Sequence, residues 1–354
     1  MRKTILATGA DIKNRFLISD GKSVHFGPEI SDLSDVRNYE LFKKEIKKAI
    51  KKNKPDIITC DLHPGYFSSK LAKEYSSKMS YKSFKPVQHH HAHIASIIYE
   101  HDLKGPVIGV SFDGTGFGTD GNIWGGEFLL VKGPKFKRLG HLKYVKMPGG
   151  DKVVYEPWRM VLSILGKKGA YLLKKIKKED KDLVISMLDK DINSPLTSSC
   201  GRLFDAAAAL LGICLYSSRE AEGPIKLESI CKRDLEESYK FKIEKYDDHY
   251  EVDTKSIFLA MAGDIKKGKE KSVIAVKFHN SMTNVIVETV KKLSKECGVK
   301  DIALSGGVFQ NNFLREKVIK ELRKARFKVF LNKANPVNDL NIAWGQYYVS
   351  GSSR

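Results

Sequence analysis

The chain of 354 residues is poor in cysteine and contains no long apolar run. Its five cysteines are odd in number and form no C-x-x-C pair, which argues against a disulfide scaffold or a cysteine zinc site and favours a reducing compartment. No stretch approaches the length of a membrane-spanning helix, and the basic N-terminus reaches Asp11 before any apolar run typical of a signal peptide. We therefore expect a cytoplasmic protein with no membrane partner.

Arginine is also scarce, although the chain is strongly basic. Lysine and arginine number 62 against 42 acidic residues, a net charge of +20, and arginine supplies only 12 of the 62. A basic surface can bind nucleic acid, but proteins that contact phosphates and bases favour arginine forks, and an excess of lysine is a habit of heat-adapted proteins. A lysine-rich proteome is therefore the favoured explanation of the basic charge, and a nucleic-acid partner is the alternative explanation.

Four histidines lie within five positions in residues 89–93. His89 and His93 are four residues apart, so a helix would place both imidazoles on one face. A single buried histidine is more often a packed core residue than a metal ligand, but packing rarely requires so many together. Two imidazoles with carboxylates suit Fe(II), Mn(II) or Zn(II), and spacing alone does not choose among these metals. The alternative is a basic cluster that binds phosphate.

A glycine-rich run, Asp113-Gly114-Thr115-Gly116-Phe117-Gly118, follows at the end of an apolar strand. We interpret it as a turn in which backbone N–H groups approach a phosphate, although it lacks the G-K-[ST] ending of a P-loop. Asp113 could complete a metal shell or orient a water. The simpler interpretation is an aspartate that caps its own turn.

A second strand–glycine–helix junction lies at Ser305-Gly306-Gly307 and runs on to Asn311. Exposed backbone amides and the positive end of a following helix would favour an anion there, although a tight turn alone would also explain the glycines. Two such junctions in one chain favour a nucleotide held between two lobes.

Three further charged residues stand out from their surroundings. Asp339 precedes the last helix, where N-capping is the ordinary role of aspartate. Arg202 and Asp205 have no evident reason to be charged on so apolar a helix, which indicates an edge that faces a ligand.

The order of strands and helices predicts an α/β fold with two similar halves. Short strands open the chain, and glycines recur where a strand meets a helix. We expect an N-terminal lobe over residues 1–135 with the metal and phosphate motifs, and a C-terminal lobe over 136–354 with a helical insertion at about 155–230. The predicted strands are 4–8, 15–19, 23–26, 56–60, 106–112, 123–131, 136–144, 239–250, 301–305 and 328–331.

The motifs together resemble a known family, the carboxyl-terminal half of HypF, the carbamoyltransferase of [NiFe]-hydrogenase maturation. The resemblance covers essentially the whole chain in the same order. It implies the two-lobed actin/Hsp70/sugar-kinase fold, a duplicated RNase H-like architecture, with relatives among TobZ antibiotic carbamoyltransferases and TsaD-type tRNA threonylcarbamoyltransferases. The matching segments are residues 61–64, 87–93, 113–116, 156–159, 197–205, 305–311 and 338–339.

The resemblance also implies roles for single residues and a set of cofactors. His89, His93, Asp113 and Asp339 would hold a divalent metal, Fe2+ or Zn2+, and His90, His91 and His63 would support them. ATP or carbamoyl-adenylate would be bound by Gly114, Thr115, Gly116, Asp205, Gly223, Ser305, Gly306, Gly307 and Asn311.

Two features depart from the HypF pattern. In residues 219–228, where HypF has a Tyr-Glu-Gly-x-Ala-Ala-x-x-Leu-Glu segment, Gly223-Pro224 is more similar to the Gly-Gly-Pro of TsaD-type enzymes. The acylphosphatase, zinc and YrdC-like adenylating domains of full-length HypF are absent from the sequence. The chain is then either one half of a longer protein or a stand-alone version, and the resemblance implies a YrdC-like domain or protein as a partner.

The function implied is transfer of carbamoyl from carbamoyl-adenylate to the carboxyl-terminal cysteine of a HypE-like acceptor. A metal would polarise the carbamoyl oxygen, and no residue of the chain would act as nucleophile. Two alternatives are a tRNA threonylcarbamoyl-type transferase, which the charge and Gly223-Pro224 favour, and a non-catalytic ATP-binding partner of a maturation complex.

Overall fold

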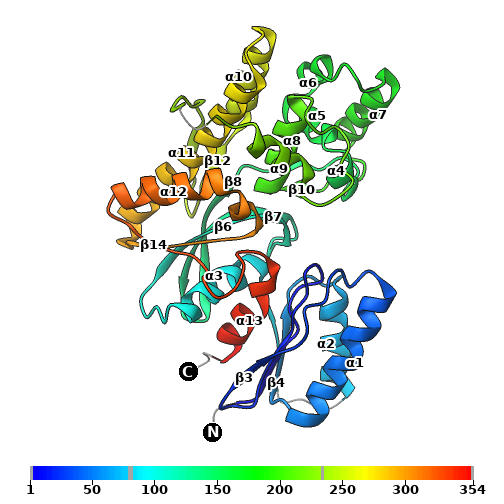
Figure 1. Ribbon diagram of the computed structural model, residues 1–354, viewed down its shortest axis with the longest axis vertical. Coiled ribbons are helices and arrows are strands. Elements are labelled where there is room, and N and C mark those ends of the chain that lie inside the picture. Colours follow the sequence, from blue (N-terminus) through cyan, green and yellow to red (C-terminus); the bar gives the residue numbers. More distant parts are fainter. Residues whose placement is uncertain (1–2, 79–82, 233–234, 352–354) are drawn as a thin grey trace.

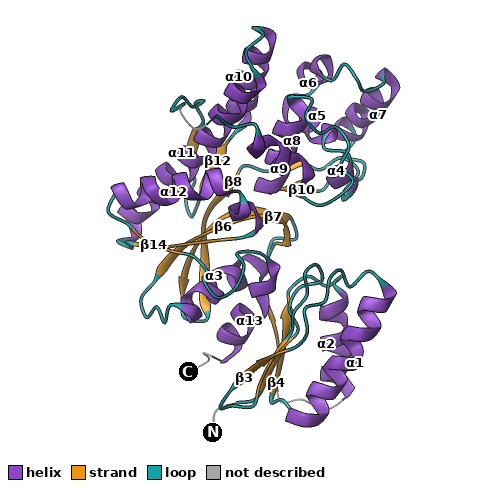
Figure 2. Ribbon diagram, in the orientation of Figure 1, coloured by secondary structure: helices purple, strands orange, loops and turns teal. Residues whose placement is uncertain are grey.

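The computed structural model describes residues 3–78, 83–232 and 235–351. Two mixed sheets lie one above the other, with helices on their outer faces and a further group of helices at the far end of the second sheet (Figures 1 and 2). Among the described residues, no helix combines the length and the apolar character that crossing a membrane requires.

The first sheet, which we call the N-terminal sheet, has the strand order β3-β2-β1-β4-β5. Its first three strands form an antiparallel meander, whereas β4 and β5 run parallel to β1. Helix α1 begins after the N-cap Asp35 and buries Phe42, Ile46 and Ile50, spaced four residues apart on one side. The elements are β1 (Ile5–Ala7), β2 (Leu17–Ser19), β3 (Val24–Phe26), α1 (Val36–Asn53), β4 (Ile57–Asp61), α2 (Phe67–Lys78) and β5 (Ser83–Val87).

The second sheet, the central sheet, repeats this plan and extends it. Strands β6, β7 and β8 form an antiparallel meander, and β13 and β14 continue parallel to β6, so that the main path of the sheet is β11-β12-β8-β7-β6-β13-β14, with β10 paired to β7 and β9 beside it. The predicted two-lobed, duplicated α/β fold is thus confirmed. The strands are β6 (Val107–Phe117), β7 (Ile123–Lys132), β8 (Lys135–Leu142), β9 (Val145–Lys146), β10 (Leu196–Thr197), β11 (Lys242–Lys245), β12 (Tyr250–Asp253), β13 (Asp301–Ser305) and β14 (Lys328–Phe330).

The lobe division predicted at residue 135 falls between β7 and β8, which are hydrogen-bonded neighbours in the central sheet. The change from one sheet to the other comes earlier, between β5 and β6. The division into residues 1–135 and 136–354 therefore stays a prediction, and its boundary differs from the boundary between the two sheets.

Two helices link the two sheets, because each packs on the sheet that does not contain the strand preceding it in the chain. Helix α3 (His89–Glu100) follows the last strand of the N-terminal sheet but packs on β6, β7 and β13. Helix α13 (Ile342–Gly351) ends the described chain and packs on β1, β4 and β5. The two helices touch at Gly345, where an added Cβ would lie 1.8 Å from the carbonyl oxygen of Ala92. Figure 1 shows this contact region between the sheets.

Apart from the short helix η2, which contacts α3 and α13, the remaining helices cover the outer side of the central sheet and share its large apolar core, which includes Phe112, Trp158, Phe204 and Phe278. Most of residues 155–230 is helical, as the sequence predicts. The helices are α4 (Lys152–Tyr155), α5 (Trp158–Leu165), α6 (Lys167–Leu172), α7 (Lys178–Asp189), α8 (Cys200–Leu210), α9 (Glu222–Ser229), α10 (Lys255–Lys266), α11 (Lys271–Cys297), η1 (Gly307–Gln310), α12 (Asn312–Lys324) and η2 (Asp339–Asn341).

Candidate metal centre and nucleotide pocket

Helix α3 positions the histidine run in the interior of the protein. Gln88 caps the helix by accepting a hydrogen bond from the N–H of His91 at 2.8 Å. Residues 89–98 are all buried because the helix is packed between the central sheet and α13. The i, i+4 spacing then turns His89 and His93 to the same side, where their ring centroids lie 4.9 Å apart.

Two carboxylates from distant parts of the chain face these imidazoles. Asp113 of β6 places Oδ2 2.8 Å from Nε2 of His93 and 3.7 Å from Nε2 of His89. Asp339 of η2 places Oδ1 3.5 Å and 3.7 Å from the same two nitrogens. One ligand atom from each of the four residues lies within 4.8 Å of every other. The structure thus brings all four predicted metal ligands together.

The opposite ring nitrogens of the two histidines are held by hydrogen-bond partners. Nδ1 of His89 lies 2.7 Å from Oδ2 of Asp61, and Nδ1 of His93 lies 2.9 Å from Oδ1 of Asn341. When Nδ1–H donates to an oxygen, Nε2 keeps its lone pair, which is the usual arrangement of a metal-ligating histidine. Nε2 of His89 is buried and has no hydrogen-bond partner among the described residues. These residues fit a divalent cation.

The remaining oxygen of Asp113 is fixed by the backbone. Its Oδ1 accepts hydrogen bonds from the N–H of Gly114 at 2.7 Å and of Gly307 at 3.2 Å. The second glycine junction therefore orients a candidate metal ligand that lies in the first motif.

Burial and charge act against each other in the cluster. Burial disfavours a charged imidazole, but Asp61 and Asp339 outweigh it and raise the pKa of His89 well above its ordinary value. Burial likewise acts to raise the pKa of Asp113, but the nearby imidazoles of His89 and His93 hold it well below the ordinary range. The cluster is thus built around two carboxylates that require a positive charge opposite them. A bound cation would supply that charge and leave the imidazoles neutral.

The other histidines do not join the four-residue cluster. Nδ1 of His90 lies 3.0 Å from Nε2 of Gln88, and burial lowers the pKa of His90 to about 3. His91 packs against Phe136, and burial lowers its pKa to about 4. His63 stacks on Tyr66 with ring centroids 4.2 Å apart. The supporting roles of these three residues stay a prediction.

The predicted glycine-rich turn at Asp113–Gly118 is wrong, because β6 continues through this run to Phe117. The ladder with β7 is irregular between Phe112 and Gly116, and this bulge releases Asp113 and Gly114 from regular pairing. A Cβ on Gly116 would lie 2.5 Å from Cε1 of His90. Gly116 therefore allows the strand to pack closely against the histidine helix, and the actual turn follows at residues 118–122.

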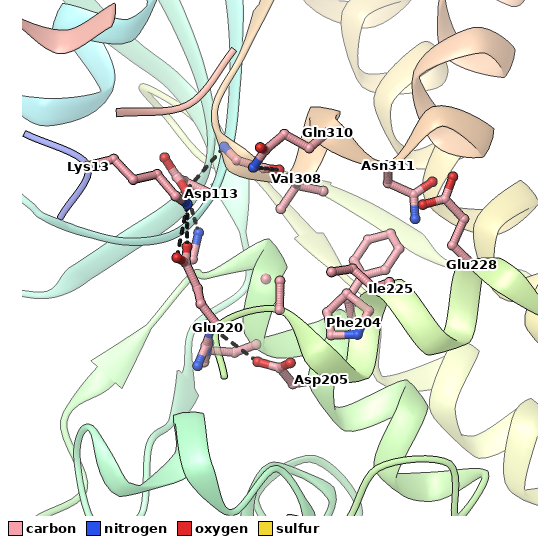
Figure 3. Close-up of a pocket in the computed structure, with 16 residues that line it drawn as sticks. Lys13, Asp113, Phe204, Asp205, Glu220, Ile225, Glu228, Val308, Gln310 and Asn311 are labelled. Atoms are coloured by element: carbon pink, nitrogen blue, oxygen red, sulfur yellow. Dashed lines mark hydrogen bonds and ion pairs between the residues drawn. The ribbon is translucent and has the colours of Figure 1, made fainter. Parts of the chain in front are cut away.

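A pocket of about 430 Å3 adjoins the cluster and shares Asp113 with it. This volume is within the usual range for small-molecule and cofactor sites. Phe204, Pro224, Ile225 and Val308 give it apolar walls, and Figure 3 shows polar groups along its edges. The full lining is Lys13, Asp113, Gly114, Gly201, Arg202, Phe204, Asp205, Glu220, Ala221, Pro224, Ile225, Glu228, Gly307, Val308, Gln310 and Asn311.

Four of the nine predicted nucleotide-binding residues line this pocket, namely Gly114, Asp205, Gly307 and Asn311. The other five are not among its lining residues. Ser305 is fully buried and places Oγ 3.4 Å from Nδ1 of His93. Gly306 has φ of +101°, and an added Cβ would lie 2.3 Å from the carbonyl oxygen of Phe112. Ser305 therefore contacts a candidate metal ligand, and Gly306 allows close contact with the backbone of β6. The pocket lining also lacks Thr115, Gly116 and Gly223.

The N-terminal end of α8 contributes positive charge to the pocket. Arg202 pairs with Asp205 at 3.1 Å, and both side chains are buried. Burial raises the pKa of Asp205, which Arg202 partly offsets. Nε and Nη1 of Arg202 are buried without a hydrogen-bond partner among the described residues. A buried guanidinium with free donors, next to the positive end of a helix, fits an anionic ligand such as a phosphate.

Four residues of the site carry no role in the sequence-based prediction. Asp61 and Asn341 orient the two histidines, and Lys13 and Glu220 form an ion pair of 2.9 Å that joins the N-terminal lobe to the segment before α9. Figure 3 shows Lys13 and Glu220 in contact at one side of the pocket. The motif at residues 61–64 and the Asn338-Asp339 pair mark two of these neighbourhoods, whereas nothing in the sequence indicates Lys13.

Comparison with known proteins defines the class of protein that this fold and site represent. Residues 1–100 match the family described as HypF Kae1-like domain, and residues 109–346 match Carbamoyltransferase, Kae1-like domain, second subdomain. A crystal structure of full-length HypF in a phosphate- and nucleotide-bound form superposes with a TM-score of 0.92 at 34% identity, over 99% of this chain and 47% of that one.

Two curated relatives agree with this class. The carbamoyltransferase HypF homolog of Cupriavidus necator is 33% identical over 98% of this chain and 91% of its own length. The probable carbamoyltransferase HypF of Methanocaldococcus jannaschii is 32% identical over 97% of this chain. The chain spans 46% of that second relative, about half its length. The chain belongs to the carbamoyltransferase HypF family.

Proposed function

We propose that this chain transfers a carbamoyl group from carbamoyl-adenylate to the carboxyl-terminal cysteine thiol of a HypE-type protein during [NiFe]-hydrogenase maturation. One observation carries the proposal: Asp113 belongs both to the His/Asp cluster and to the lining of the pocket. A ligand in that pocket therefore has its reactive end beside the candidate metal site. The family membership reported above supports carbamoyl as the group transferred.

The pocket accounts for binding of the donor. The free donors of Arg202 and the N-terminal end of α8 would bind the phosphate of the adenylate. Asp205 would accept a hydrogen bond from the ribose, and Phe204, Pro224 and Ile225 would contact the base. Full-length HypF has been solved with nucleotide and phosphate bound, which supports a nucleotide as ligand in this family.

His89, His93, Asp113 and Asp339 would hold the divalent metal, Fe2+ or Zn2+. When bound, such a metal acts as a Lewis acid that polarises a carbonyl oxygen and stabilises developing negative charge. With a metal bound, Asp61 and Asn341 would accept hydrogen bonds from Nδ1–H of His89 and His93, so that each Nε2 lone pair would face the metal. Gly114 and Gly307 hold Asp113 so that its second oxygen faces the histidines.

The acceptor supplies the nucleophile, a thiolate, which is reactive without activation by a base of this chain. A carbon–sulfur bond forms as the bond between the carbamoyl carbon and the phosphate oxygen breaks, and AMP leaves. Cys60, Cys200 and Cys214 are buried, and burial raises the pKa of the thiols of Cys60 and Cys200, so these thiols are poor substitutes for an external acceptor.

The test combines the protein with ATP, carbamoyl phosphate, a YrdC-like protein and a HypE-type acceptor, and measures the acceptor's carboxyl-terminal peptide by mass spectrometry. We expect a carbamoylated cysteine with the wild type and with His25→Ala, an exposed histidine remote from the cluster. His89→Ala is expected to abolish transfer while the circular dichroism spectrum stays native. Equal transfer by His89→Ala would refute the proposal.

The two alternatives give different outcomes in related measurements. A tRNA threonylcarbamoyl-type transferase would bind tRNA with an affinity that falls steeply with salt and would leave the acceptor cysteine unmodified. A non-catalytic ATP-binding partner would bind ATP tightly without metal and without turnover.

A further inference from the structure

A second group of potential metal ligands lies on β8 and β12 of the central sheet, two and three strands away from β6, which carries Asp113. His141 of β8 and Glu251 of β12 are directly paired in the parallel register between these strands. His249 immediately precedes β12, at the end of the β11–β12 hairpin. One ligand atom from each of the three residues lies within 4.8 Å of the others.

Both imidazoles in this group are oriented through Nδ1. His141 Nδ1 lies 2.9 Å from the carbonyl oxygen of Leu142, and His249 Nδ1 lies 2.7 Å from Oδ1 of Asp248. Donation from each Nδ1–H leaves Nε2 as the free lone pair, and a carboxylate behind a histidine is a common outer partner in zinc sites. These are the features that also fix His89 and His93.

The distances suit a small cation. Nε2 of His141 lies 3.9 Å from Oε1 of Glu251, which is too long for a hydrogen bond. Ligand atoms about 2.0–2.2 Å from a tetrahedral zinc ion lie about 3.3–3.6 Å from one another, so these two atoms would move together by about 0.3–0.6 Å on binding. His249 lies on the β11–β12 hairpin with its side chain 27% exposed, and one of its ring nitrogens already lies within 4.8 Å of the ligand atoms of His141 and Glu251.

The surroundings leave the site accessible from one side only. His141 is buried, with 3% of its surface exposed. Arg138 is neutralised by Glu127 at 2.6 Å. The side chain of Glu251 is 18% exposed, which leaves a path for an ion from solvent.

We propose that His141, His249 and Glu251 bind a zinc-type divalent cation, with solvent at the remaining position, and that this ion fastens the β11–β12 hairpin to β8. Two imidazoles and one carboxylate are ligands that Zn2+ accepts. The site is separate from the candidate centre on α3, because none of its residues belongs to that cluster.

Ring stacking is the competing explanation for these histidines. The centroids of His141 and His249 lie 5.2 Å apart at an interplanar angle of 13°, and Tyr246 stacks on His249 at 5.3 Å. Stacking would place the rings here without any metal. The decisive quantity is therefore the number of metal ions bound per chain.

The test measures zinc by inductively coupled plasma mass spectrometry after incubation with Zn2+ and gel filtration. In a His89→Ala/His93→Ala background, we expect one equivalent of zinc per chain. Adding His249→Gln or Glu251→Gln should remove it, whereas adding the control His25→Ala should not. Absence of zinc from the background protein, or retention of the full equivalent after His249→Gln, overturns the proposal.

A second measurement covers the case in which the double variant fails to fold. Titration of the intact protein with Co2+, followed by its visible absorption, counts all sites at once. His249→Gln is expected to bind one equivalent fewer than the wild type and His25→Ala the same number. Equal numbers for wild type and His249→Gln favour stacking and contradict the proposed site.

Discussion

Replacing Asp61 by asparagine tests how the protein prepares His89 for a metal. Asp61 accepts two hydrogen bonds at once: Oδ1 from the N–H of His63 at 2.8 Å and Oδ2 from Nδ1–H of His89 at 2.7 Å. An asparagine has only one acceptor oxygen. If its NH2 group faces His89, the ring takes the other tautomer and Nε2 carries the proton. If it faces His63 instead, two N–H groups confront each other.

Either arrangement costs free energy in a site where the side chains of Asp61 and His89 are 1% exposed. Leaving a buried donor without an acceptor costs about 1–3 kcal/mol. At about 1.4 kcal/mol per factor of ten, this corresponds to metal affinity weakened roughly 5- to 150-fold. Mutations of outer partners of metal-bound histidines typically cost 10- to 100-fold, which agrees.

The assay is competition for Zn2+ or Fe2+ against a chromophoric chelator, with thermal melting of the metal-free protein to separate affinity from loss of fold. Asp20→Asn is the matched control, because Asp20 also accepts backbone N–H groups but lies on an exposed turn. Wild-type affinity in Asp61→Asn would show that the carboxylate does not set the tautomer of His89, and the reasoning would fail.

Three further predictions follow from the same structure. Gly345→Ala should lower the midpoint of urea unfolding by an amount that corresponds to about 1–3 kcal/mol or more, because the new Cβ would overlap Ala92. The control Gly263→Ala should be neutral or stabilising, because no atom lies within 4 Å of its new Cβ. Burial lowers the pKa of His279 from 6.5 to about 4. The unfolded chain therefore takes up a proton first, and up to about 3 kcal/mol of the free energy of unfolding is lost as the pH falls from 6.5 toward 4. His279→Gln should flatten that part of the pH profile of urea unfolding. Glu220→Gln should change the free energy of unfolding by less than about 1 kcal/mol, because its ion pair with Lys13 is largely exposed; a larger loss would mean that this pair holds the lobes together.

Local patterns in the sequence predict most elements of the fold. Helix α1 is recognisable from Phe42, Ile46 and Ile50, which repeat at the helical period, and β13 coincides with the predicted strand 301–305 because a short apolar run meets two glycines there. The spacing of His89 and His93 determines their common face for the same reason.

Contacts through space account for what the sequence does not reveal. Gly116 and Gly306 are conspicuous as glycines, yet whether a glycine makes a turn or admits a close neighbour depends on the partner, here His90 and the backbone of Phe112. The pairing of Asn341 with His93 likewise joins residues 248 positions apart, and no local pattern encodes it.

The most direct test of the proposed function compares metal-stripped and metal-reconstituted protein in the carbamoyl transfer reaction. The quantity measured is the rate at which the acceptor's carboxyl-terminal cysteine gains a carbamoyl group. We expect no transfer after removal of the metal with a chelator and recovery of the rate in proportion to the metal restored, with no recovery in Asp339→Asn. Transfer at the full rate by the stripped protein would contradict the central role assigned to His89, His93, Asp113 and Asp339.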